Sequence, residues 1–149
     1  MRKITLNNYR TDKYYPKITA AVSRILGKTD FVSPIELFSE MGLLDLENVR
    51  RWKRGEVKYL EQVIQCNLAK SSRILRIFRF HAHDLNLGPS MTVYKNGKQF
   101  LRFSKTGERP LEEAYSRHFV VIGKKKREKL ENTMQEASDE GSDDGKITQ

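Results

Sequence analysis

Four cationic side chains surround the single tryptophan of the chain, Trp52, within residues 46–55. They are Arg50, Arg51, Lys53 and Arg54. Guanidinium and ammonium groups bind phosphate oxygens, and the planar fork of arginine also suits bidentate contacts with base edges. Val49 and Trp52 are three residues apart, a spacing that places both on one side of a helix. The segment therefore predicts a helix anchored by Val49 and Trp52, with cations on its exposed side that could contact nucleic acid.

Further cations lie in two later segments of the chain. Arg73, Arg76 and Arg79 recur at three-residue spacing, and we expect them to extend the same footprint along a phosphate backbone. The loop 104–109 combines short polar side chains, a glycine and two cations, Lys105 and Arg109. Such a loop could form an anion-binding nest of backbone N–H groups, and a solvated connection between elements explains the same residues.

The charge of the chain divides at residue 123. The 149 residues carry 28 Lys and Arg against 19 Asp and Glu, a formal net charge of +9. Residues 1–123 hold 22 of these cations and 12 of the acids, a net charge of +10, whereas residues 124–149 hold 6 and 7. Large apolar residues are scarce after residue 123, so we expect 1–123 to form one compact basic domain and 124–149 a disordered charged tail.

The sequence offers little for an enzyme or a metal site. The lone Cys66 cannot form an internal disulfide, and His81 and His83, two residues apart, point to opposite sides of a helix. Residues 27–29 are similar to the end of a phosphate-binding loop, but Val22 stands where that motif needs its first glycine. We expect no catalytic residues, no cofactor and no metal ligands. No run reaches the roughly 18 apolar residues of a membrane span or forms a signal peptide, so we expect a cytoplasmic protein.

Apolar periodicity predicts a mainly helical α+β fold. We expect helices over residues 17–26, 34–41, 46–54 and 108–119, and one long helix over about 57–83. The strongest helix start is Ser33-Pro34-Ile35-Glu36, because serine caps, proline is tolerated at the first helical position and glutamate at the third completes a capping box.

Asn96-Gly97 predicts a β-hairpin with a two-residue turn, which would place Val93 opposite Phe100 and Tyr94 opposite Gln99. We expect one face of this hairpin to pack on the long helix and residues 120–122 to form a third strand. The hairpin also carries Lys95, Lys98 and Arg102 among its aromatic residues. A basic β-surface for RNA is conceivable, although the four-stranded sheet of RNA-recognition folds is missing.

Residues 33–64 resemble phage-repressor-like helix-turn-helix regulators. The predicted helix 34–41, Gly42 and the helix ending in Trp52-Lys53-Arg54-Gly55 occur in the order of that motif. Phe38 stands where the family has alanine, and the interval from Gly42 to Trp52 is one residue longer. The resemblance implies that the helix containing Trp52 enters the major groove of DNA.

A second resemblance covers residues 33–120. Small bacterial proteins of unknown function share Pro34-Ile35-Glu36, the Arg51-Trp52 to Gly55 turn, Tyr59-Leu60-Glu61 and an Arg-Phe-Ser-Lys-x-Gly loop, here residues 102–107. This resemblance implies a bacterial cytoplasmic setting and no particular activity.

Charge and motifs together favour a non-enzymatic nucleic-acid-binding or regulatory protein, with DNA and RNA both open as partners and no membrane. The alternative is a protein-interaction module whose basic surface binds an acidic protein. A purely structural interpretation of the same residues is two amphipathic helices with a solvated basic face. The sequence carries no signal for an oligomeric state.

Overall fold

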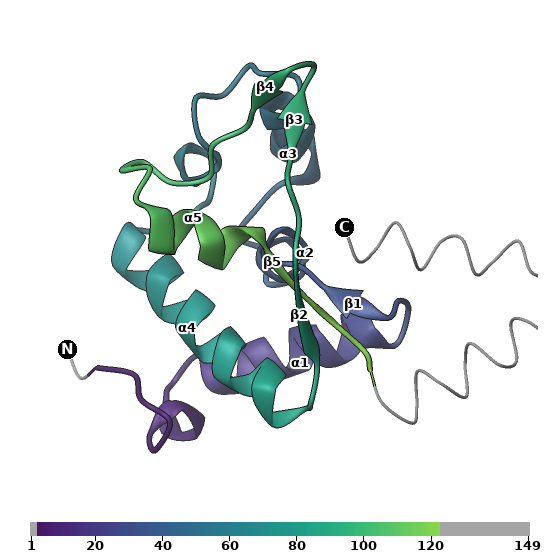
Figure 1. The fold of residues 1–149 in the computed structure, drawn as a ribbon. Helices are drawn as coiled ribbons and strands as arrows, with labels where there is room; N and C mark the ends of the chain where they lie inside the picture. The colour runs from purple at the N-terminus through teal and green to yellow at the C-terminus, as the bar shows by residue number, and fades with distance from the viewer. Residues whose placement is uncertain (1–2, 123–149) are drawn as a thin grey trace, which may run out of the picture.

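A computed structural model of the chain describes residues 3–122, so the predicted tail 124–149 lies outside the described residues. The fold is α+β, as predicted, with five α-helices and a small antiparallel sheet in the described range (Figure 1). The helices are α1 (Tyr15–Leu26), α2 (Pro34–Glu40), α3 (Leu46–Lys53), α4 (Leu68–Asp84) and α5 (Arg109–Ser116). The strands are β1 (Phe31–Val32), β2 (Gly88–Met91), β3 (Lys95–Asn96), β4 (Gln99–Phe100) and β5 (Arg117–Val120), and 3₁₀ turns cover Tyr9–Thr11 and Leu60–Gln62.

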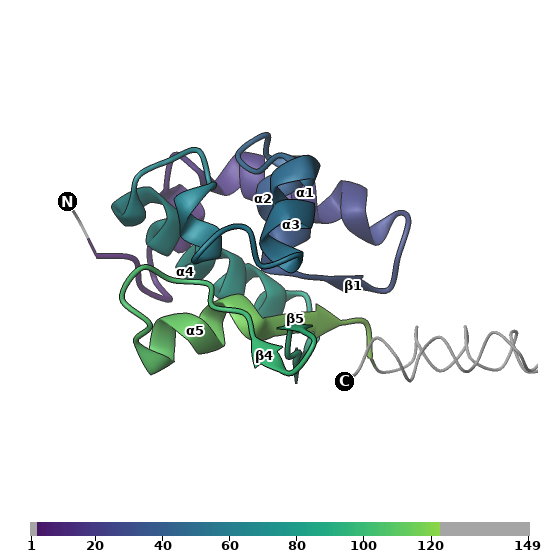
Figure 2. The same cartoon turned by 90° about the horizontal axis from the view of Figure 1, so that it is seen from above.

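The sheet has the order β1-β5-β2, with both pairs antiparallel. The predicted third strand therefore exists, but it covers 117–120 instead of 120–122. Helix α4 packs against it, with Phe78 edge-on to Phe119 at 5.1 Å between ring centroids. Seen from above, α1, α2 and α3 gather on one side of the molecule and α5, β4 and β5 on the other (Figure 2). No helix within residues 3–122 has the length and apolar character needed to cross a bilayer.

The helix pair α2 and α3 begins where the sequence predicts. The Glu36 N–H donates to the Ser33 hydroxyl at 3.1 Å, and the Glu36 carboxylate accepts the Ser33 N–H at 3.3 Å, which completes the capping box. Asp45 caps α3 by accepting the Glu47 N–H at 2.9 Å. Between the helices Gly42 has φ +77°, a conformation that favours glycine.

The prediction of one long helix over 57–83 is wrong in its first half, because α4 begins only at Leu68. The preceding backbone is hydrogen-bonded to distant segments instead. The Leu60 and Glu61 N–H groups donate to main-chain carbonyls of residues 102 and 103 at 3.1 and 2.8 Å. Asn67 then caps α4 by accepting the Lys70 N–H at 2.8 Å. These tertiary hydrogen bonds outweigh the helical periodicity of 57–67.

The hairpin exists, but its register and its packing differ from the prediction. Lys95 pairs with Phe100 and Asn96 with Gln99, so the two-residue turn is 97–98. Gly97, with φ +63°, occupies its first position, as in a type II′ turn. The Asn96 side-chain amide donates to the Arg54 carbonyl at 3.1 Å, which keeps Asn96 out of the turn. The hairpin consequently lies against α3 and not against α4 (Figure 1).

Candidate nucleic-acid interface

Trp52 and Val49 anchor α3, as predicted, because both are buried in the hydrophobic core. The indole of Trp52 lies 5.1 Å from the Phe103 ring and 5.4 Å from the Tyr94 ring. Its N–H donates to the Arg102 carbonyl at 2.8 Å. Three residues of the 94–103 segment therefore surround the tryptophan, so the helix and the hairpin segment form one packed unit.

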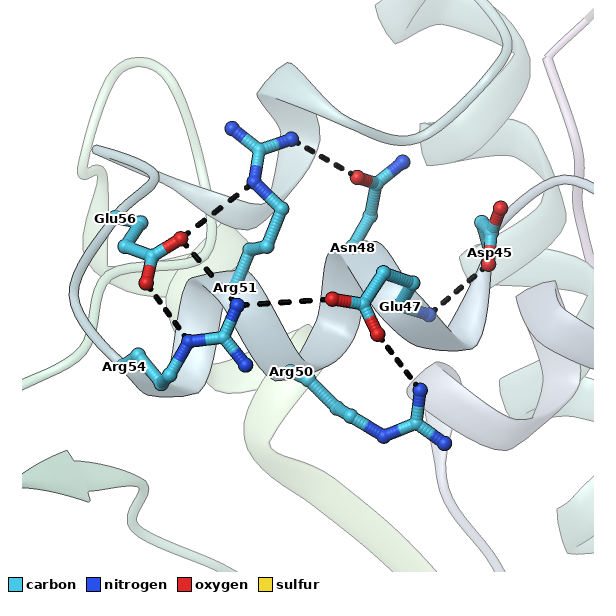
Figure 3. A network of polar contacts seen from close by, with 7 residues as sticks. All are labelled: Asp45, Glu47, Asn48, Arg50, Arg51, Arg54 and Glu56. Carbon is cyan, nitrogen blue, oxygen red and sulfur yellow. Dashed lines mark hydrogen bonds and ion pairs between the residues drawn. The ribbon is translucent and has the colours of Figure 1, made fainter.

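Arg50 and Arg51 of α3, and Arg54 directly after it, are paired with two glutamates that were not among the predicted site residues (Figure 3). Arg50 contacts Glu47 at 2.9 Å, and Arg54 contacts Glu56 at 2.7 Å and Glu47 at 3.6 Å. Arg51 contacts Glu56 at 3.7 Å. The Glu47–Arg50 pair follows from helical spacing. The Glu56 contacts do not, because Glu56 lies beyond the turn at Gly55. Two carboxylates thus offset much of the charge of three guanidinium groups.

These ion pairs favour the charged form of each partner, but they hold the side chains in place only weakly. The hydrogen bond from Arg54 lowers the pKa of Glu56, and the reciprocal bond raises the pKa of Arg54. All the side chains in this network are about half exposed. Exposed ion pairs contribute little net free energy, so another anion can replace a glutamate at small cost. The three guanidinium groups are therefore half exposed and held by weak ion pairs.

The hairpin arm, which we define as residues 93–102, contributes positive charge without any acid. No Asp or Glu occurs between Asp84 and Glu108. No ion pair within residues 3–122 involves Lys53, Lys95 or Lys98. The Lys53 ammonium lies 5.9 Å from the Tyr94 ring centroid, so it joins α3 to the arm. The two lysines of the arm, Lys95 and Lys98, therefore lie on a single short hairpin, and not on the four-stranded sheet of RNA-recognition folds.

The arginines of α4 do not form one exposed row. Arg73 forms a buried ion pair with Asp12, with an Nε–Oδ2 distance of 2.6 Å. Arg76 donates to the Ile4 carbonyl at 2.7 Å and lies 5.6 Å from the Phe80 ring centroid. Residues three apart on an α-helix differ by about 60° in direction, so this spacing winds the arginines around the helix. Arg79 lines a hollow of about 420 Å³ together with Phe80 and Arg117, and Arg76 and Arg79 both line a second hollow of about 600 Å³.

The loop 104–109 is a nest of N–H donors, but the protein fills it with its own carboxylates. The N–H groups of Phe103 and Ser104 donate to Glu112 at 3.2 and 2.7 Å. The Lys105 N–H donates to the buried carboxylate of Glu61 at 2.8 Å. The candidate phosphate site at this loop is therefore already occupied. Of its two cations, Lys105 is exposed, and Arg109 is paired with Glu113 at 3.1 Å.

The histidines and the cysteine are dispersed. His118 is buried, its Nε2 lies 3.0 Å from the Tyr94 hydroxyl, and burial lowers its pKa to about 4. His81 is buried at another place, beside α1, where its ring is edge-on to Tyr15. Burial raises the pKa of the Cys66 thiol. In the part of the chain that the structure describes, no three His, Cys, Asp or Glu side chains gather in a group that could hold a metal ion.

Comparison with known proteins adds no relative: no protein-family model, curated protein or solved structure matches the chain. Any functional conclusion therefore depends on the geometry of α3, the hairpin arm and the charges that they carry.

Proposed function

We propose that the protein binds nucleic acid through a composite surface made of the exposed side of α3 and the hairpin arm. The observation that carries this proposal is the attachment of an acid-free, lysine-bearing hairpin to the end of an arginine-bearing helix. Asn96 of the arm is hydrogen-bonded to the Arg54 carbonyl, and Tyr94 packs on Trp52. Positive charge from two segments about 50 residues apart in sequence is thus held in one place.

The arginines of α3 would exchange their intramolecular partners for phosphate. Arg50, Arg51 and Arg54 are half exposed and bound only to flexible glutamates and an asparagine. A polyanion replaces these partners and releases condensed counterions, a favourable contribution that the isolated glutamates lack. Because guanidinium groups bind phosphate bidentately, the pre-aligned side chains of α3 suit this exchange.

The lysines would strengthen the interaction without setting its sequence preference. Lys53, Lys95 and Lys98 are exposed point charges, which contact backbone phosphates in a manner that carries no base information. Their positions on either side of the α3–hairpin junction would fix the direction in which a strand crosses the surface.

The test is fluorescence anisotropy of the full chain with labelled duplex and single-stranded oligonucleotides at about 50 and about 200 mM salt. We expect the Lys95→Gln/Lys98→Gln variant to bind more weakly and to reduce the slope of log K against log salt by about two. The matched control is Lys13→Gln/Lys17→Gln, which removes the same charge at the start of α1, far from the hairpin (Figure 1).

Three outcomes would overturn the proposal. They are no binding of any oligonucleotide at about 50 mM salt, binding without salt dependence, and equal losses in the lysine variant and its control. The first, together with salt-dependent binding of a polyglutamate peptide, would instead support the acidic-protein partner.

A further inference from the structure

One aromatic ring of the hairpin arm is exposed without a packing reason. Phe100 is 66% exposed, and every other Phe, Tyr and Trp side chain in residues 3–122 is buried or half-buried. Phe100 takes no part in the hydrophobic core. By contrast, Tyr94 of the same arm packs against Trp52. The Phe100 ring is therefore presented to solvent and not to the core. An exposed ring on a basic arm offers a surface on which a base can stack.

The surroundings of Phe100 are cationic. Lys95 is its cross-strand partner, and the Lys95 ammonium lies over one side of the ring, 4.7 Å from its centroid. Lys98 is in the adjoining turn. An exposed ring next to cations is the arrangement by which proteins hold unpaired nucleotides. The side of the ring away from Lys95 would stack on the base, and the cations would bind the flanking phosphates.

The arm that presents the ring is fixed to the rest of the fold. Besides the Asn96–Arg54 hydrogen bond, the Leu101 N–H donates to the Tyr94 carbonyl at 2.9 Å, which continues the hairpin pairing toward Trp52. Gly55 allows this close approach, because a Cβ there would lie 2.7 Å from the Asn96 side-chain nitrogen. A ring held in place in this way loses little conformational entropy when a base stacks on it.

We infer that the hairpin arm binds an unpaired base by stacking on Phe100, so that the protein prefers single-stranded to duplex nucleic acid. This inference rests on the proposed function. In a duplex the faces of the bases are covered by their neighbours, and a ring on a short hairpin reaches a base face only where the strand is unpaired. Neither the ring nor the lysines distinguish the 2′-hydroxyl, so single-stranded DNA and RNA share the required chemistry.

The test compares binding of a 15-nucleotide oligothymidylate, the matching oligouridylate and a 15-base-pair DNA duplex to the full chain by anisotropy. We expect Phe100→Ala to weaken binding of both single strands by about tenfold and to change duplex binding by less than about twofold. Phe100→Trp restores single-strand binding, because the larger ring also stacks. A strand containing 2-aminopurine reports the stacking directly, through a fluorescence change that Phe100→Ala abolishes.

The control is Val93→Ala, which removes exposed apolar surface from the same arm without removing a ring, since Val93 is 63% exposed. Equal effects of Phe100→Ala and Val93→Ala, or equal losses for single strands and duplex, would overturn the stacking inference. Such results leave the proposed function intact as long as Lys95→Gln/Lys98→Gln still weakens binding. If the unmodified protein binds no nucleic acid, both the stacking inference and the proposed function are overturned. A difference between the DNA and RNA strands that Phe100→Ala removes would support stacking and identify the preferred strand.

Discussion

The indole N–H of Trp52 and the main-chain carbonyl of Arg102, fifty residues further along the chain, are joined by a 2.8 Å hydrogen bond. The same carbonyl accepts the Leu60 N–H at 3.1 Å. One backbone oxygen thus connects α3, the 3₁₀ turn Leu60–Gln62 and the end of the hairpin arm. Because these segments are distant in sequence, the proposed interface exists only in the folded protein.

Trp52→Phe should weaken this connection while retaining most of the buried aromatic surface. The Arg102 carbonyl keeps the Leu60 N–H as a donor, so no buried acceptor is left unpaired. We expect the free energy of unfolding to fall by about 1–3 kcal/mol, from the lost hydrogen bond and the space left by the smaller ring. Urea unfolding measures this change. Hydrogen exchange should show faster opening in the hairpin arm than in α4, and uniform acceleration would contradict the proposed connection.

Arg73→Gln should affect stability and not nucleic-acid binding. The Arg73 side chain is 14% exposed and its partner Asp12 only 3% exposed. Removing one member of a buried ion pair leaves the other uncompensated, which costs about 3–5 kcal/mol. Arg79→Gln is the matched control on the same helix, because Arg79 is exposed and its replacement should change stability by less than about 0.5 kcal/mol. If Arg73→Gln weakened binding under conditions where it is fully folded, Arg73 would belong to the interface.

Glu56→Gln should increase affinity for nucleic acid. Glu56 contacts both Arg51 and Arg54, so its neutralisation removes the negative charge that these two guanidinium groups share, and Arg54 keeps only its longer contact with Glu47. We expect affinity at low salt to rise several-fold, with a steeper salt dependence. Glu40→Gln is the control, since Glu40 pairs with Arg24 at 3.6 Å, away from the interface. Equal gains in the two variants would show that net charge alone is responsible.

Local signals predicted the elements that depend on residues close in sequence. Ser33 with Glu36 fixes the start of α2, Asp45 caps α3, and the spacing of Val49 and Trp52 identifies the buried side of α3. In each case the groups that satisfy the backbone or fill the core lie within a few residues of one another. Such signals can be recognised in the sequence without knowledge of the fold.

The errors occurred where a distant partner decides the structure. Periodicity continues through residues 57–67, but the N–H groups of Leu60, Glu61 and Gln65 donate to the carbonyls of residues 102, 103 and 43 instead of continuing a helix. The hairpin turn moves by one residue because Asn96 binds the Arg54 carbonyl. The loop 104–109 has the composition of an anion site, and the anions are Glu61 and Glu112 of the same chain. No sequence pattern identifies these partners before the fold brings them together.

The buried His118 should make stability fall as the pH is lowered from 7 toward 4. Burial lowers its pKa in the folded protein to about 4, whereas in the unfolded chain it has its ordinary value of 6.5. Between these values the unfolded state binds a proton that the folded state does not, so the stabilisation is fully present above pH 6.5 and is lost as the pH approaches 4. The loss amounts to about 3 kcal/mol.

Burial also shifts the pKa values of His81 and Glu36, so the effect of His118 is isolated with His118→Gln. Burial also lowers the pKa of His81, which acts in the same direction, whereas burial raises the pKa of Glu36, which opposes it. Glutamine keeps a hydrogen-bonding group near the Tyr94 hydroxyl and has no proton to gain. Urea unfolding at intervals from pH 7 to pH 4 should show a shallower decline in the variant than in the unmodified protein, whatever its absolute stability. Parallel declines would mean that His118 is not the group responsible.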